Sequence, residues 1–253
     1  MENSSISITT QISFRLRSFI SRHPLLYFSL LRLRGVDMTH AVNAQTEIAI
    51  VGHGGSGNSY ATDAFKTCQP DKVIAHHLHR PAMVVSAVAR NLPCLVLVRH
   101  PIDAISSTTS RISGPHFTLK SMAMALSDYA NFHDSIIDLR DDFIVCGFRE
   151  IVVDYQKVID RVNKRFEKNY RVPKTGSDDS LRIIAQHKYP GNRRMHALDD
   201  IQEALNSPQL EKYRQRAERS YREFCEVTGI SFEKDPPRKP AERNPNAERH
   251  MSV

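Results

Sequence analysis

Short apolar runs alternate with segments of helical spacing through the middle of the chain. Four runs have the length and composition of buried parallel strands, at 47–51, 72–75, 94–98 and 143–146. Pro93 and Pro101 bound the third run, and Pro101 is placed to open a helix. The alternation predicts an α/β fold, with a parallel sheet flanked by helices.

Helices are expected at 58–67, 81–90, 102–111, 119–139, 154–167 and 199–227, the last interrupted at Ser207-Pro208. Asp154 has the residue type of an N-cap for its helix. The organisation predicted is an N-terminal amphipathic helix with a connector over 1–46, an α/β domain over 47–232 with a helical C-terminal part, and a disordered tail over 233–253. The tail carries four prolines among mixed charges.

Charge narrows the choice of partners. The 253 residues are 40% apolar and carry a formal net charge of +7, which indicates a soluble domain with anionic partners. Basic and aromatic residues do not interleave as a single-strand groove needs, so nucleic acid is not expected. The first 34 residues hold five arginines and one acidic residue. An amphipathic helix packed on the domain is the favoured interpretation, with a membrane-surface contact or a targeting peptide as alternatives.

The four cysteines lie far apart, without the spacing of a zinc site. Cys94 and Cys146 fall inside apolar runs and are expected in the core. This usage suits a reducing cytoplasm, so a cytoplasmic location is expected, with the membrane surface as the alternative. The sequence contains no carboxylate-rich metal motif, and no metal is expected.

The first apolar run leads directly into a glycine-rich loop. Gly52 to Ser59 (GHGGSGNS) has the spacing of the P-loop motif G-x-x-x-x-G-K-[ST], with Asn58 where the motif has Lys. Glycines let backbone N–H groups turn inward around a phosphate, and the next helix adds its N-terminal dipole. The loop predicts phosphate binding, with a β–α turn that binds nothing as the alternative. Loss of the Lys argues against ATP hydrolysis, because that cation neutralises the β- and γ-phosphates.

This loop and the third strand together resemble the PAPS-dependent sulfotransferases (PAPS is 3′-phosphoadenosine 5′-phosphosulfate). The phosphosulfate loop of that family reads basic-Ser-Gly-Thr-Thr/Ser after a strand, and Gly-Ser-Gly-Asn-Ser stands in the corresponding place here. The family also has an Arg at the end of a buried strand and a Ser eight positions later, as Arg99 and Ser107 are here. The resemblance implies that the 3′-phosphate is held by Arg99 and Ser107. It implies that the 5′-phosphosulfate is held by Gly55, Ser56, Gly57, Asn58 and Ser59.

Three histidines follow the second strand, and one matches the family's catalytic base. His77 precedes Leu78 and lies twenty-two positions before Arg99, a separation typical of the family's animal cytosolic members. A neutral imidazole with a pKa of about 6.5 suits removal of a proton from an acceptor. Strand-like alternation would point His77 to the opposite side from His76 and His79.

The resemblance extends beyond these motifs. Residues 145–159 are similar to the family's segment from a strand into a helix, so the match covers about 47–166. Arg193 and Arg194 resemble the family's late basic loop over the 3′-phosphate, with a solvated basic turn as the alternative.

One residue departs from the family pattern. The family has Lys or Arg where Gly55 stands, a cation that assists departure of the bridging oxygen. Either His53 substitutes for it or catalysis is weakened.

The resemblance implies transfer of a sulfuryl group from PAPS to a hydroxyl or amine of a small-molecule, glycan or lipid-linked acceptor. The alternatives are a P-loop small-molecule kinase or nucleotide enzyme, and a non-catalytic nucleotide-binding accessory protein. The pattern specifies neither the acceptor nor an oligomeric state.

Overall fold

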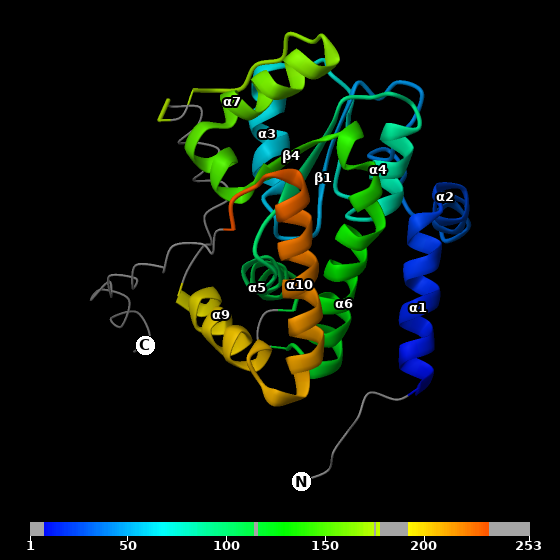
Figure 1. Ribbon diagram of the computed structural model, residues 1–253, viewed down its shortest axis with the longest axis vertical. Coiled ribbons are helices and arrows are strands. Elements are labelled where there is room, and N and C mark those ends of the chain that lie inside the picture. The colour runs from blue at the N-terminus through cyan, green and yellow to red at the C-terminus, as the bar shows by residue number, and fades with distance from the viewer. Residues whose placement is uncertain (1–7, 114–115, 175, 178–191, 233–253) are drawn as a thin grey trace, which may run out of the picture.

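The four apolar runs form one parallel sheet in the structure, a computed structural model. Its strands are β1 (Ile48–Gly52), β2 (Ile74–Ala75), β3 (Cys94–Val98) and β4 (Ile144–Gly147), in the order β2-β1-β3-β4 (Figure 1). The structure describes residues 8–113, 116–174, 176–177 and 192–232. The expected α/β fold with a parallel sheet is therefore confirmed.

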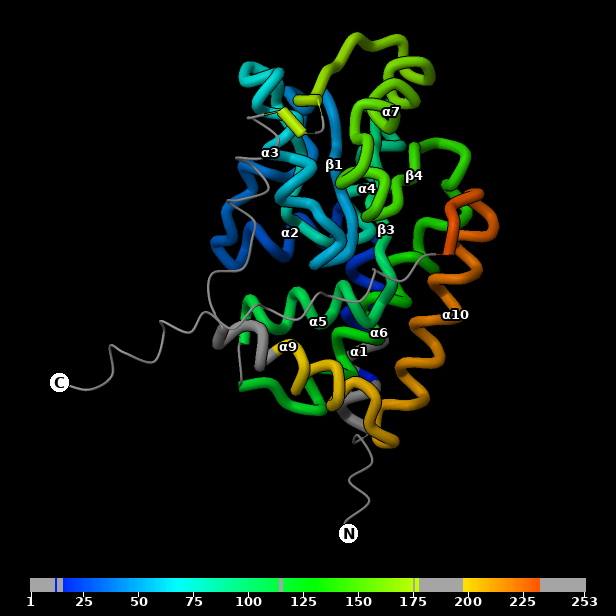
Figure 2. The backbone as a smooth tube through the Cα atoms, turned by 90° about the vertical axis from the view of Figure 1, so that its left-hand side faces the viewer, coloured from blue at the N-terminus to red at the C-terminus, as the bar shows by residue number. Residues whose placement is uncertain are grey.

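Helices cover both faces of the sheet (Figure 2). On one face lie α3 (Asn58–Cys68) and α7 (Phe148–Phe166). The opposite face packs against a second set of helices, which share a hydrophobic core with it: α4 (Pro81–Val88), α5 (Pro101–Ile112), α6 (Leu119–Ile136), α9 (Asn192–Leu205) and α10 (Glu211–Thr228). Two 3₁₀ turns, Ile137–Asp142 and Pro208–Leu210, follow α6 and precede α10. The interruption expected at Ser207-Pro208 is confirmed.

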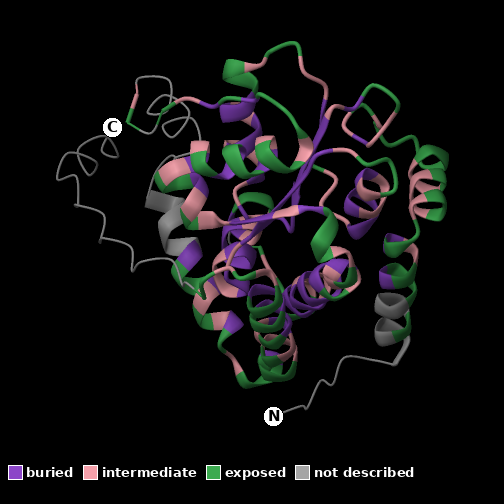
Figure 3. Cartoon of the chain, turned by 45° about the horizontal axis from the view of Figure 1, so that its top comes forward, coloured by how far each residue is buried: buried purple, intermediate pink, exposed green. Residues whose placement is uncertain are grey.

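The strands alternate their side chains between the two cores. Ile50 and Leu97 pack toward α3 and α7, whereas Val51 and Val96 pack toward α4 and α6. β1 and β3 are buried along their whole length, as Figure 3 shows for the centre of the molecule. Burial on both faces is the reason these strands read as continuous apolar runs. Cys94 and Cys146 lie in the core as expected.

The helix after β4 begins earlier than the sequence suggested. α7 starts at Phe148, where the Glu150 carboxylate accepts a hydrogen bond from the Gly147 N–H at 2.8 Å. Asp154 has non-helical dihedral angles (φ −155°, ψ 73°) and accepts a hydrogen bond from the Lys157 N–H at 3.4 Å. Asp154 therefore caps the second half of a kinked helix, and the start predicted at 154 was wrong by six residues. The first half forms because Ile151 is fully buried on the sheet, a tertiary contact.

The N-terminal region forms two helices in place of the single one expected. α1 (Ile8–Arg22) contacts α4 and α6, and α2 (Pro24–Leu33) contacts α1 and α4 (Figure 1). Pro24 opens the second helix, a position where its missing N–H costs nothing. In the described part of the chain, no helix combines the length and apolar character needed to cross a membrane. The predicted tail at 233–253 and most of the polar stretch before α9 lie outside the described residues.

Candidate functional site

The four strands end at the same edge of the sheet, and each is followed by a part of the candidate site. The glycine loop follows β1, and His77, Arg99 and Phe148 come after β2, β3 and β4. Ligands of open parallel sheets bind beyond this edge, where loops from different strands converge. The topology thus brings together residues that are up to a hundred positions apart.

The glycine loop is held tightly between two helices. Gly55 and Gly57 have φ values of +83° and +94°, in the left-handed region that side chains disfavour. A Cβ atom at Gly57 would lie 2.5 Å from Ile151 Cδ1 of α7. One at Gly55 would lie 2.1 Å from the Ala104 carbonyl oxygen of α5. At Gly55 only glycine fits unless α5 moves, because the close atom belongs to the backbone; at Gly57 the left-handed backbone and the side chains of α7 disfavour a larger residue.

This packing gives a physical reason for the departure at Gly55. A basic side chain there would have to pass the backbone of α5 at Ala104 and the hydroxyl of Thr108, which is 2.7 Å from the added Cβ. The cation that the resembled family carries at this position is therefore incompatible with the present contact between loop and α5.

His53 does not supply the missing cation. Its Nδ1 donates a hydrogen bond of 3.1 Å to the Gly54 carbonyl, and its ring packs edge-on against Tyr129 with centroids 5.1 Å apart. Burial lowers the pKa of His53 to about 3, with His133 and other nearby groups adding to the effect. At neutral pH the ring is uncharged, so the idea that His53 replaces the cation is not supported.

Asn58 closes the loop in place of the usual lysine. Its side-chain Nδ2 donates to the carbonyl oxygens of His53 at 3.1 Å and Gly52 at 3.4 Å. The amide is almost fully buried and uncharged. It therefore shapes the loop from within and cannot act as a cation toward a phosphate.

Arg99 lies directly against the loop. Its Nη1 donates a hydrogen bond of 2.8 Å to the Gly55 carbonyl, and its guanidinium carbon lies 4.0 Å from the ring centroid of Phe148. The hydroxyl of Tyr129 donates to the Arg99 carbonyl at 2.6 Å, which fixes the backbone. Ser107, the other residue expected to hold the 3′-phosphate, is 8% exposed on α5.

His77 meets the other end of the loop. Its Nε2 lies 3.3 Å from the Ser59 hydroxyl in the first turn of α3, and its side chain is exposed to solvent. The backbone at His77 is left-handed, with φ +64°. Partial burial and the adjacent His40 lower the pKa of His77 below its ordinary value, so the imidazole is neutral at pH 7.

The neighbouring histidines also face the site, contrary to the expected alternation. β2 ends at Ala75, so His76 to His79 do not follow a strand pleat. His79 Nδ1 donates to the Gly52 carbonyl at 2.9 Å, and His76 Nδ1 contacts His77 Nδ1. Burial lowers the pKa of His76 to about 3 and that of His79 to about 4.

Across the described ranges, no group of three or more His, Cys, Asp or Glu is arranged to hold a metal ion.

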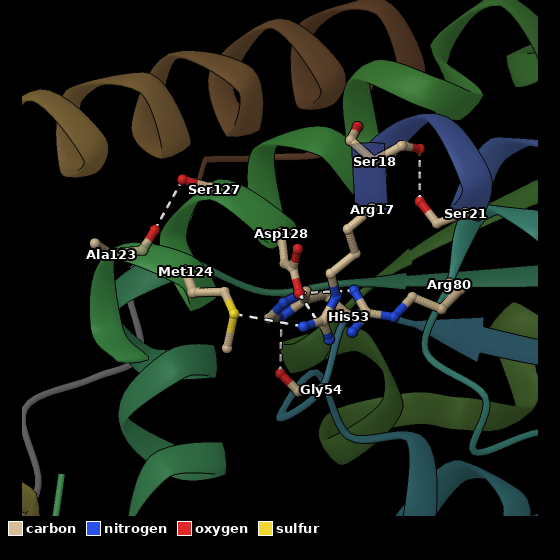
Figure 4. Close-up of polar contacts among 10 residues, drawn as sticks. All are labelled: Arg17, Ser18, Ser21, His53, Gly54, Arg80, Ala123, Met124, Ser127 and Asp128. Carbon is tan, nitrogen blue, oxygen red and sulfur yellow. Dashed lines mark hydrogen bonds and ion pairs between the residues drawn. The ribbon is translucent and has the colours of Figure 1, made fainter. Parts of the chain in front are cut away.

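A charged network connects the loop region to α1 (Figure 4). Asp128 of α6 binds Arg80 at 2.7 Å and Arg17 of α1 at 3.5 Å, and the charge of Arg80 contributes to the lowered pKa of His53. Arg80 immediately follows the histidine segment, so this ion pair ties that segment to α6. Both partners of the Arg80 pair are mostly buried, which strengthens the attraction relative to a surface pair.

Sequence reasoning missed several residues at the site. Phe148 had a readable signal, an aromatic residue directly after the fourth strand, whereas Asp128 and Tyr129 lie in an ordinary helix pattern. Thr108 adjoins the predicted Ser107, and its hydroxyl borders the loop. Arg193 and Arg194 fall in α9, but their side chains lie outside the described part of the chain.

Comparison of the chain with protein-family models and with curated proteins finds no match in either.

Proposed function

We propose that this chain binds PAPS in a P-loop-type fold and transfers its sulfuryl group to a hydroxyl or amine. The observation that carries the proposal is the meeting of three segments at the glycine loop. His77 Nε2 lies 3.3 Å from Ser59 Oγ at one end, and Arg99 Nη1 lies 2.8 Å from the Gly55 carbonyl at the other. An anion-binding loop, a guanidinium and a neutral imidazole are the groups that this reaction requires.

In this proposal the phosphosulfate lies on residues 55–59, where backbone N–H groups and the dipole of α3 favour an anion. Two hydroxyl groups support it: Ser56 Oγ and Thr108 Oγ1 are buried and, among the described residues, have no hydrogen-bond partner. Buried polar groups are normally paired, and a hydroxyl can donate to a phosphate or sulfate oxygen. Binding of an anion would satisfy both groups.

The 3′-phosphate is assigned to Arg99 and Ser107. A phosphate oxygen is a stronger acceptor for a guanidinium than a neutral carbonyl is. Nucleotide binding would therefore exchange the Arg99–Gly55 hydrogen bond for one to phosphate, while stacking on Phe148 keeps the guanidinium oriented. Because Gly55 belongs to the loop assigned to the phosphosulfate, the same exchange would couple binding of the 3′-phosphate to binding of the 5′-phosphosulfate.

His77 is assigned as the general base. As the acceptor oxygen or nitrogen forms its bond to sulfur, the sulfur–oxygen bond to the 5′-phosphate breaks, and 3′,5′-ADP leaves with that electron pair. The proton lost by the acceptor passes to the neutral His77 ring. Because the side chain is exposed, an acceptor can approach it from solvent.

A second candidate is a nucleotide-binding accessory protein without turnover. The observation that favours it is the packing of Gly55, which leaves no room for the leaving-group cation, combined with the neutral state of His53. A small-molecule kinase has less support, because Asn58 is uncharged and is engaged with the carbonyl groups of the loop.

Ligand-induced thermal stabilisation tests the proposal with four nucleotides. 3′,5′-ADP should stabilise the protein by roughly 2.7 kcal/mol at about 100-fold above its Kd. 5′-AMP lacks the phosphate assigned to Arg99, and 2′,5′-ADP carries the same charge at the wrong ribose position. Both should stabilise much less. Equal shifts from all three, or a larger one from Mg-ATP, would contradict the proposal. Release of labelled sulfate or sulfated product from PAPS then separates an enzyme from the accessory protein.

A further inference from the structure

Among the side chains of α1 that the structure describes, those buried against the domain are polar, the reverse of an ordinary surface helix. Ser18 and Ser21 are buried, and Arg17 reaches inward to Asp128. A helix packed on a soluble domain normally buries its apolar side chains and exposes its polar ones. In α1 the apolar residues at helical spacing are instead turned outward, and 55–60% of each remains exposed: Ile12, Leu16 and Phe19.

The next helix extends this apolar surface. α2 has the sequence PLLYFSLLRL and contains no buried residue, so the colour for buried residues is absent from it in Figure 3. Leu25 and Leu33 are 86% and 85% exposed. A helix that is apolar on most sides is normally covered by protein or lipid. We name this N-terminal apolar surface by its exposed members: Ile12, Leu16, Phe19, Leu25, Leu26 and Leu33.

The segment that forms this surface carries charge of one sign. Between residues 3 and 36 the chain has five arginines and no acidic residue. Four of these arginines are exposed on α1, on α2 or just after it: Arg17, Arg22, Arg32 and Arg34. Arg17 is paired with Asp128 of α6, and the other three arginines lie beside the exposed apolar side chains. This combination fits the surface of a bilayer, which has an apolar interior and anionic head groups.

We propose that α1 and α2 bind in the plane of an anionic lipid bilayer, with the N-terminal apolar surface inserted among the acyl chains. A second copy of the chain fits less well, because a two-fold contact would bring arginines of one copy against those of the other. Neither helix is long and apolar enough to span the bilayer. The inference does not depend on the proposed function.

Vesicle cosedimentation of the full chain, without nucleotide, tests this inference. We expect binding to phosphatidylcholine vesicles containing about 30% phosphatidylserine, and little binding to phosphatidylcholine alone. Salt at about 0.5 M should weaken the binding, because it screens charges at a membrane surface. The double variant Leu25→Ser/Leu33→Ser should reduce the partition coefficient by about tenfold or more. Arg32→Ser/Arg34→Ser should reduce it by roughly 25-fold, at about fivefold for each arginine.

Val153→Ser/Val227→Ser is the matched control. It removes two exposed apolar residues from α7 and α10 and should leave vesicle binding unchanged. Equal binding to both vesicle types, or unchanged binding of the Leu25/Leu33 variant, would overturn the proposal. So would a dimer in sedimentation velocity that the Leu25/Leu33 variant abolishes, because the surface would then be a contact between copies.

Discussion

The Nε2 atom of His77 lies 3.3 Å from the hydroxyl of Ser59, which joins the segment after β2 to the first turn of α3. Among the three histidines that follow β2, this pair singles out His77 as the one that is both exposed and next to the end of the glycine loop. His76 is buried, and His79 is engaged with the Gly52 carbonyl.

Replacement of His77 should separate catalysis from donor binding. His77→Asn is the suitable variant, because asparagine tolerates the left-handed backbone at φ +64° but cannot act as a base. We expect turnover of labelled PAPS to fall by about 10²–10⁴-fold with little change in the Kd for 3′,5′-ADP. His116→Asn, on an exposed residue, is the control. Full activity in His77→Asn would remove this residue from the mechanism.

Arg99 should contribute to nucleotide affinity more than to folding. Arg99→Ala removes a charge-assisted hydrogen bond worth about 1.5–3 kcal/mol, so the Kd for 3′,5′-ADP should rise roughly 10- to 150-fold by calorimetry. The Kd for 5′-AMP should change far less, since it lacks the 3′-phosphate. Arg140→Ala removes an exposed arginine from the 3₁₀ turn after α6 and should affect neither ligand. A similar loss for both nucleotides would place Arg99 at a different part of the ligand.

Gly55 should not accept the side chain that the resembled family carries. Gly55→Ala adds both left-handed strain, about 1–2 kcal/mol, and a clash with α5 that typically costs about 1–3 kcal/mol more. Gly35→Ala isolates the strain, because Gly35 has φ +66° and no atom within 4 Å of the added Cβ. Urea unfolding should show the larger loss for Gly55→Ala, and Gly55→Lys should not raise turnover. Equal losses of unfolding free energy for the two alanine variants would mean that α5 can move away from the added Cβ without destabilising the protein.

Buried histidines should make the protein less stable in mild acid. Burial lowers the pKa of His53 to about 3 and that of His133 to about 4, against about 6.5 in the unfolded chain. Their contribution to stability is therefore complete above about pH 6.5. It is lost as the pH falls toward 4, because only the unfolded state then binds protons. The slope should be about 1.4 kcal/mol per pH unit for each histidine.

Urea unfolding between pH 7.5 and 5 measures this slope. His133→Phe provides the internal comparison, because the ring packs among aromatic residues, including Phe132 and Phe224. The variant should lose stability at pH 7.5 through the missing hydrogen bond to the Tyr129 carbonyl, yet show a shallower decline in acid. An unchanged slope would show that His133 titrates normally in the folded protein.

The sequence alone determined the order of strands and helices in the sheet domain and the position of the glycine loop. Buried strands must be short apolar runs, and prolines and glycines act within a few residues of where they stand, so both leave local patterns. The expected strand at 94–98 matches β3 residue for residue. The parallel order also predicted that the loops after the strands lie at one edge, and the resemblance selected Arg99 and His77 within those loops.

Tertiary structure decided what those residues do. Only the contact with Ala104, which is 49 positions away in the chain, shows that Gly55 cannot carry a cation. Only burial against Tyr129 shows that His53 is neutral. The inward direction of Arg17 on α1 likewise depends on Asp128, which is more than a hundred residues away in the chain. Protonation, steric fit and exposure depend on neighbours that the fold brings together, and a local pattern in the sequence does not contain them.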